Sequence, residues 1–200
     1  MPTREFRCKG IRYHPIKLGN SWKIGYALDL HTLSSVPDGF GGFNTERSPL
    51  GQLVYDLKYG GRKKNAGKIA RIMADWIWRK YPHYKIDCLA AIPPSEKRSY
   101  QPVLEIVKKL SELLAIENCS SKIRKVKETR SLKALFDPTE RRKELSNAFQ
   151  VDSDVSKERI LLVDDLFRSG ETAEAVKRAL KAAGARDILL ITATKTRVHR

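Results

Sequence analysis

The 200-residue sequence has few cysteines and no apolar run long enough to span a membrane. Its three cysteines, Cys8, Cys88 and Cys119, lie far apart and form no Cys-x-x-Cys pair, which excludes a zinc ribbon. The opening stretch MPTREFRCKG lacks the apolar core of a signal peptide. We therefore expect a cytoplasmic protein without a disulfide framework, because the cytoplasm keeps thiols reduced. Within the apolar stretch IDCLAAI, Cys88 is expected to be a buried hydrophobic side chain.

Acidic side chains are also scarce relative to basic ones. The chain has 23 aspartates and glutamates against 39 lysines and arginines, which gives a net charge of +16. Such an excess predicts a polyanionic partner, either nucleic acid or a multiply phosphorylated small molecule. A uniformly basic, solvated surface is the alternative interpretation. Local clustering of basic residues at 62–64, 122–127 and 141–143 slightly favours a partner.

The first 45 residues differ in composition from the rest of the chain. Aromatic and β-branched residues lie on both sides of Gly19-Asn20, a pattern typical of an antiparallel hairpin or a small sheet. The glycine-rich stretch 37–44 is interpreted as a connector. We therefore assign residues 1–45 to a small β-rich N-terminal hood and residues 46–200 to an α/β core.

The core begins with two predicted helices and continues with alternating strands and helices. Ser48-Pro49 provides an N-cap and a first helical residue, and Gly60-Gly61 ends that helix. A second helix follows, in which Trp76 is expected in the core and Trp78 at its rim. Apolar strands alternating with amphipathic helices predict a mainly parallel sheet with helices on both faces. The expected strands are 86–92, 159–166 and 187–194, and the expected helices between them are 102–114 and 170–184.

The stretch ILLVDDLFRSGET, residues 160–172, combines features that suit a sugar phosphate. Ligands of open parallel sheets bind beyond the carboxyl ends of the strands, and a helix N-terminus there offers free N–H groups to a phosphate. The pair Asp164-Asp165 can accept hydrogen bonds from vicinal hydroxyls such as those of ribose. Gly170 allows close backbone approach, while hydroxyls and a positive charge come from its neighbours. An ordinary solvated strand end or a phosphoacceptor or Mg²⁺ pocket is the alternative reading.

These 13 residues resemble the phosphoribosyl pyrophosphate (PRPP) signature of type I phosphoribosyltransferases. The resemblance implies the fold of that family, an α/β fold with a mainly parallel sheet and a small hood. It also implies that Asp164 and Asp165 bind the ribose 2′- and 3′-hydroxyls, and that Mg²⁺ is bound through PRPP rather than directly by the protein. The 5′-phosphate would be wrapped by Arg168, Ser169, Gly170, Glu171 and Thr172.

Two further segments have implied roles in the same family. The loop after the first core strand binds pyrophosphate, and a charged segment closes over the site as a lid that excludes water. A solvated turn and a disordered basic loop are the respective alternatives. The pyrophosphate loop here is Pro94, Ser95, Glu96, Lys97 and Arg98, and the lid contains Lys125, Lys127, Thr129 and Arg130.

A narrower resemblance to ComF-like proteins covers residues 50–196, on the stretches YDLKYGGRKKNAGKIA, AIPPSEKRSYQPV, KETRSLKALFDPTERRKELSNAF and ILLVDDLFRSGET in that order. That branch commonly begins with a four-cysteine zinc module, which this chain lacks, so no zinc is expected. The resemblance implies phosphoribosyl transfer from PRPP to an unidentified acceptor, with release of pyrophosphate. The alternative is a non-catalytic adaptor or sensor that acts with single-stranded DNA or a helicase in DNA uptake. Lys58, Thr129, Leu132, Arg141 and Phe149 match residues usual in that branch.

Overall fold

The computed structural model describes residues 5–94, 99–129, 135 and 137–197, and its centre is a six-stranded sheet. Neighbouring strands are parallel except for β3 and β4, which pair in an antiparallel manner. The mainly parallel sheet predicted from the sequence is thus confirmed. The strand order is β3 (Ile16–Lys17), β4 (Gly25–Leu30), β12 (Asp187–Lys195), β11 (Arg159–Phe167), β7 (Cys88–Ala91) and β8 (Glu117–Asn118).

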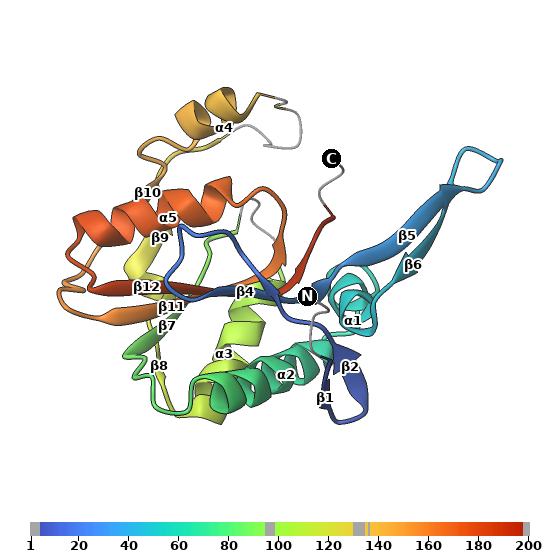
Figure 1. Ribbon diagram of the computed structural model, residues 1–200. Coiled ribbons are helices and arrows are strands. Elements are labelled where there is room, and N and C mark those ends of the chain that lie inside the picture. The colour runs from blue at the N-terminus through green and yellow to red at the C-terminus, as the bar shows by residue number, and fades with distance from the viewer. Residues whose placement is uncertain (1–4, 95–98, 130–134, 136, 198–200) are drawn as a thin grey trace.

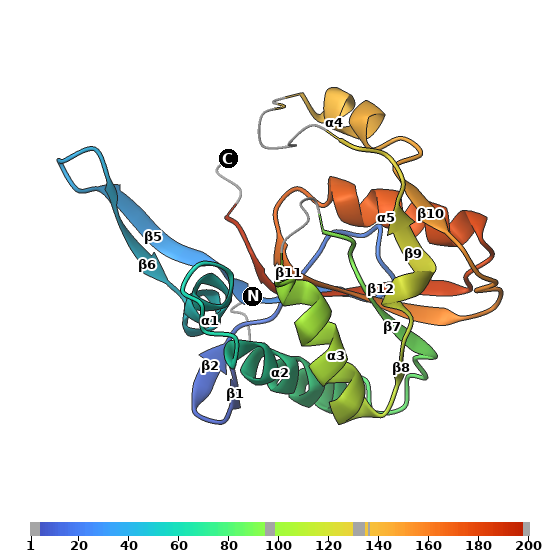
Figure 2. The same ribbon diagram turned by 180° about the vertical axis from the view of Figure 1, so that it is seen from behind.

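Helices cover both faces of this sheet, as Figures 1 and 2 show from opposite sides. One face carries α1 (Pro49–Lys58), α2 (Asn65–Lys80) and α3 (Pro102–Leu114), and the other carries α5 (Glu171–Ala182). Because both faces are dry, β7 and the first part of β11 are apolar throughout rather than alternating. Within the described ranges, no helix is long and apolar enough to cross a membrane.

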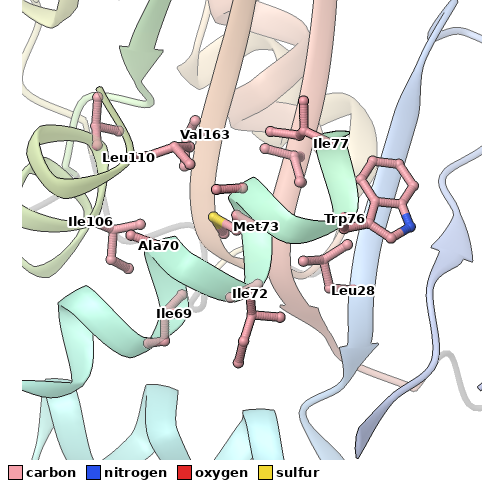
Figure 3. Packing of buried hydrophobic residues seen from close by; sticks show 14 of the residues in the cluster. Leu28, Ile69, Ala70, Ile72, Met73, Trp76, Ile77, Ile106, Leu110 and Val163 are labelled. Carbon is pink, nitrogen blue, oxygen red and sulfur yellow. The ribbon is translucent and has the colours of Figure 1, made fainter. Parts of the chain in front are cut away.

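The core consists of two clusters separated by the sheet. Figure 3 shows the larger cluster, in which side chains of α2 lie beside Ile106 and Leu110 of α3 on one side, while Trp76 lies near Leu28 of β4 on the other. Successive residues of β11 alternate between the clusters: Val163 belongs to the α1–α3 side and Leu162 to the α5 side. Trp76 is buried and Trp78 is exposed, which confirms the expected core and rim positions.

The start of α1 is fixed against the end of β4. Ser48 is the N-cap, as predicted: its hydroxyl accepts a hydrogen bond from the Gly51 N–H (2.9 Å) and donates one to the Leu30 carbonyl. A Cβ on Gly51 would collide with the His31 carbonyl, so only glycine allows this approach. The start of α1 is therefore held beside the carboxyl end of β4, and its last residue, Lys58, lies over the edge of the sheet.

Short antiparallel strand pairs lie within the first 47 residues. β1 (Phe6–Cys8) pairs with β2 (Ile11–Tyr13), and β5 (Thr32–Pro37) pairs with β6 (Phe43–Arg47) to form an arm that projects from the body (Figures 1 and 2). The glycine-rich stretch interpreted as a connector is the turn of this arm, and it presents Phe40 with 97% of its surface exposed. β3 and β4, which belong to residues 1–45, are strands of the main sheet. The division of the chain into a hood, residues 1–45, and a core, residues 46–200, stays a prediction.

Residues 123–129 and 137–151 form a separate excursion from the main fold, next to α5. β9 (Ile123–Lys125) pairs with β10 (Phe149–Val151), after a 3₁₀ turn at Ser120–Lys122. Between them, α4 (Pro138–Glu144) lies over α5 in both views (Figures 1 and 2).

The structure contains a disulfide between Cys88 and Cys119. Cys88 is buried as expected, but the sequence alone did not predict this single disulfide. The reason is topological: β8 pairs in parallel with β7, with Glu117 opposite Cys88 and Asn118 opposite Leu89, so Cys119 lies only two positions beyond the residue opposite Cys88. The two Cα atoms are consequently 6.0 Å apart, although 31 residues separate them in sequence.

Candidate functional site

Both predicted carboxylates lie at the carboxyl edge of the parallel strands. β7 ends at Ala91, opposite Val163, and the Ile92 N–H donates a last hydrogen bond to the Val163 carbonyl (3.0 Å). Asp164 and Asp165 follow at once, while β11 remains paired with β12 as far as Phe167. The aspartates therefore lie beyond the end of β7, on a part of β11 that still pairs with β12. This is the position where an open parallel sheet receives its ligands.

Asp165 points to the α1 side and is engaged by Lys58. The Lys58 Nζ lies 2.8 Å from Asp165 Oδ1, and the two side chains are 21% and 5% exposed, respectively. Burial acts to lower the pKa of Lys58, but the carboxylates of Asp165 and Asp164 outweigh burial and raise it. The ammonium therefore stays charged and holds the Asp165 carboxylate in place.

The main chain of Asp165 is held by a second pair of polar groups. Thr194 of β12 donates its hydroxyl proton to the Asp165 carbonyl (3.2 Å), and His31 Nδ1 lies 3.1 Å from the same hydroxyl oxygen. Since threonine has one hydroxyl proton, His31 is the donor in the second contact. Burial, with the nearby charges of Arg47 and Lys58, lowers the pKa of His31 and favours the neutral ring. The strand is thus fixed at Asp165 through both side chain and backbone.

Asp164 points to the other face, toward α5, and is partly exposed. Its Oδ1 accepts a hydrogen bond from the Asp165 N–H (2.8 Å). Burial raises the pKa of Asp164 to about 8, and the negative charge of Asp165 adds to this effect while Lys58 opposes it. A carboxylate in such surroundings is stabilised by added hydrogen-bond donors, and the hydroxyls of a sugar would provide them.

The loop after β11 turns directly into α5. Gly170 is the N-cap of α5 with φ of 86°, and a Cβ there would lie 2.6 Å from the Phe167 ring. Glycine is therefore required twice, for the left-handed backbone and for the contact with Phe167. Arg168 and Ser169 are exposed. The N–H groups of the first turn of α5, including that of Thr172, have no intrahelical partners and can donate hydrogen bonds to an anion.

Glu171 introduces a negative charge at this helix start. Its Oε1 lies 3.4 Å from Nη1 of Arg141, a residue of α4 that the sequence places 30 positions earlier. Of the residues predicted to wrap a 5′-phosphate, Glu171 is thus the one whose side chain is already paired.

The predicted pyrophosphate loop and lid are only partly within the described residues. Pro94 is exposed beyond β7, whereas Ser95, Glu96, Lys97 and Arg98 lie outside the described residues, as does Arg130. In the lid, Lys125 is in β9, Thr129 is partly buried, and the Lys127 Nζ donates to the Glu144 carbonyl (3.1 Å). Lys127 therefore ties the start of the excursion to the end of α4.

The basic cluster 62–64 lies beside Tyr100, two residues after the predicted pyrophosphate loop in the sequence. The Lys63 ammonium is 5.1 Å from the centre of the Tyr100 ring, and the buried hydroxyl of Tyr100 has no hydrogen-bond partner among the residues that the structure describes. The contact brings a cation from the α1–α2 connection close to the segment that follows residues 95–98.

Residues 63–198 match the family model described as the phosphoribosyl transferase domain, which covers more than half of the chain. The chain belongs to the phosphoribosyltransferase family. The mainly parallel sheet, the helices on both faces and the small antiparallel strand pairs near the N-terminus are those of the type I phosphoribosyltransferase fold. The predicted fold class is therefore confirmed.

Solved phosphoribosyltransferase structures are similar at low sequence identity. UMP synthase of Leishmania donovani is 19% identical with a TM-score of 0.40, over 79% of this chain and 27% of that one. Adenine phosphoribosyltransferase of Saccharomyces cerevisiae is 14% identical with a TM-score of 0.44, over 81% and 82%. Glutamine PRPP amidotransferase of B. subtilis is 16% identical with a TM-score of 0.46, over 76% and 34%. The chain thus spans about a quarter of the UMP synthase and a third of the amidotransferase. No curated protein matches the sequence.

The sequence alone assigns no role to several residues around the aspartates. Lys58 and Arg141 match positions usual in ComF-like proteins, Arg141 also belongs to the basic cluster 141–143, and no pattern in the sequence points to Thr194 or His31. A signal for Lys58 was present: Leu50, Val54 and Leu57 form the buried face of α1, and Lys58 lies one turn after Val54 on that face. A lysine at a core-facing position needs a buried carboxylate as its partner.

Proposed function

We propose that the chain binds PRPP at the junction of β11 and α5 and transfers its phosphoribosyl group to an acceptor, with release of pyrophosphate. One observation carries this proposal. β11 presents two carboxylates beyond the end of β7 and then passes, through the Gly170 cap, into a helix start that faces the same side as Asp164. Carboxylates that can accept hydrogen bonds from sugar hydroxyls, and N–H groups that can donate hydrogen bonds to a phosphate, thereby lie a few residues apart on one edge of the sheet.

The proposed roles follow from what each group can exchange. Asp164 is the more exposed carboxylate and would accept hydrogen bonds from the ribose hydroxyls directly. Asp165 is buried against Lys58, so its contribution combines one ribose contact with a fixed negative charge below the sugar ring. Arg168, Ser169 and Thr172 would meet the 5′-phosphate with a guanidinium and two hydroxyls, alongside the helix N–H groups.

The leaving group would be bound by the loop Pro94 to Arg98, and Lys63, which lies over the Tyr100 ring, would add a further cation. Mg²⁺, when bound together with PRPP, would supply positive charge to offset that of the pyrophosphate. Among the described residues, no group of three or more His, Cys, Asp or Glu side chains could hold a metal ion. The protein's own task is to position the ribose and to stabilise charge as the bond to pyrophosphate breaks.

Calorimetry with PRPP and Mg²⁺ tests the proposal. The variant Asp164→Asn/Asp165→Asn keeps the side-chain volumes but replaces both carboxyl groups by amides, and we expect PRPP affinity to fall by about a hundredfold or more. Glu112→Gln/Glu117→Gln is the matched control, since it removes two exposed carboxylates on α3 and β8. Equal affinity of wild type and the Asp164/Asp165 variant would refute the site; a loss in the control would indicate nonspecific electrostatics.

A second candidate is a ComF-like adaptor or sensor that binds PRPP without turnover and acts with single-stranded DNA or a helicase. The net charge of +16 favours it. Pyrophosphate release with one member of a panel of bases and amines would favour the enzyme, and PRPP binding without release across the panel would favour the sensor. DNA binding predicts an affinity that falls linearly with salt on a log–log scale, and no binding at low salt would exclude it.

A further inference from the structure

Glu171 is an unusual residue to find at a proposed phosphate site. It is the first residue of α5, where its charge is favourable for the helix in the absence of ligand. Its side chain is only 13% exposed, and the buried Oε2 has no hydrogen-bond partner within the described residues. A 5′-phosphate bound at the same helix start would therefore meet a carboxylate that is poorly screened by water.

Arg141 is placed to cancel that charge. Its Nη1 lies 3.4 Å from Glu171 Oε1, and its Nε donates to the Leu135 carbonyl (2.7 Å). The side chain is 24% exposed, so the guanidinium is shielded from water and directed rather than freely solvated. These two hydrogen bonds hold the guanidinium at the start of α5. In the described part of the chain, Glu171 makes no other ion pair with α4.

We propose that Arg141 is a positioning residue for the 5′-phosphate, acting through Glu171. The inference rests on the proposed function, because it requires a phosphate at the start of α5. Arg141 neutralises the Glu171 carboxylate and holds it to one side, so that the phosphate meets the helix N–H groups without an opposing charge. When Arg141 is absent, Glu171 is an unpaired anion at an anion site and repels the ligand.

The contact also joins the phosphate site to the excursion between β9 and β10. α4 lies over α5, and Lys127 in the predicted lid donates to the carbonyl of Glu144 at the end of α4 (Figure 1). Docking of α4 through Arg141 and binding of the 5′-phosphate therefore favour each other. By linkage, PRPP should strengthen the docking of α4 by the same factor by which docking strengthens PRPP binding.

Four variants measured by calorimetry with PRPP and Mg²⁺ test the proposal. Arg141→Gln is expected to weaken binding by about 10- to 50-fold, and Arg142→Gln, an exposed neighbour on α4 with the same charge change, by about twofold at most. Glu171→Gln should bind at least as tightly as wild type. The double variant Arg141→Gln/Glu171→Gln should bind within about threefold of Glu171→Gln, because the unpaired charge is gone.

This rescue separates charge compensation from a merely structural role. If Arg141 only supported α4, the double variant would bind as poorly as Arg141→Gln, and the proposal would be wrong. Equal binding by Arg141→Gln and Arg142→Gln would also overturn it, while leaving the PRPP site intact.

The same titrations with ribose 5-phosphate distinguish failure of the two proposals. Binding of ribose 5-phosphate that depends on Arg141, without binding of PRPP, would support the inference and sink phosphoribosyl transfer. No binding of either ligand to the wild type would overturn both.

Discussion

Replacing Lys58 by methionine should destabilise the protein far more than loss of a surface lysine does. Methionine keeps most of the apolar stem and removes the ammonium that lies 2.8 Å from Asp165. Asp165 is 5% exposed, so its carboxylate would be left buried without its partner. Breaking a buried ion pair in this way costs about 3–5 kcal/mol. Because Lys58 itself is 21% exposed and water can reach the vacated position, we expect a loss of about 2–4 kcal/mol.

The assay is urea unfolding of wild type, Lys58→Met, Asp165→Asn and the double variant, with Lys68→Met as the control. Lys68 is an exposed lysine on α2, and its replacement should change the free energy of unfolding by about 0.5 kcal/mol at most. The double variant should be more stable than Lys58→Met, because no unpaired charge remains.

The effect also has a defined pH dependence. The folded pKa of Lys58 is raised above 10.5, so the stability from its charge is fully present below pH 10.5 and is lost only as pH rises through the higher folded value. The difference between wild type and Lys58→Met should therefore be constant from about pH 5 to 7, below the pKa of about 8 of Asp164, on which Lys58 also acts. A loss below about 1 kcal/mol, typical of a surface pair, or a double variant no more stable than Lys58→Met would refute the reasoning.

Two further substitutions test the opposite side of the strand and the start of α5. For Asp164, whose folded pKa of about 8 exceeds the ordinary value of 3.8, wild type should lose stability as pH rises from about 4 to 8. The amide oxygen of Asp164→Asn can still accept the hydrogen bond from the Asp165 N–H. By thermal unfolding, the variant should match wild type near pH 4 and be more stable by about 1–3 kcal/mol at pH 8. A difference in stability that does not change with pH would contradict the raised pKa of Asp164. Gly170→Ala places a Cβ against Phe167 at positive φ and should destabilise by about 2–4 kcal/mol in urea unfolding. Gly67→Ala in α2, where a Cβ meets nothing within 4 Å, should instead stabilise by about 0.5–1 kcal/mol, and equal effects at the two glycines would contradict this account.

The sequence predicted those features that depend on local chemistry. Ser48-Pro49 has the hydroxyl and the fixed φ of a helix start, and α1 begins there. The apolar runs before Asp164 and from Asp187 onward need cover on both faces, and both became central parallel strands. The loop from Arg168 to Thr172 follows its strand and opens a helix as expected, because glycine at a strand-to-helix junction is itself the conformational signal.

Contacts between distant segments could not be predicted in the same way. Lys58 and Asp165 are 107 positions apart, and only the sheet topology and the direction of α1 bring them together. The Cys88–Cys119 pairing likewise depends on the return of the chain along β8, which no spacing rule reveals. The arm formed by β5 and β6 was missed because its glycine-rich turn resembles a connector when the pairing of its flanks is unknown.

A crystal structure with PRPP and Mg²⁺ tests the central claim most directly. The account predicts the 5′-phosphate within hydrogen-bonding distance of the backbone N–H groups from Gly170 to Thr172, and a ribose hydroxyl on the carboxylate of Asp164. Glu171 should remain paired with Arg141. PRPP bound elsewhere on the basic surface, with the start of α5 free of phosphate and Asp164 remote from the ribose, would contradict the account.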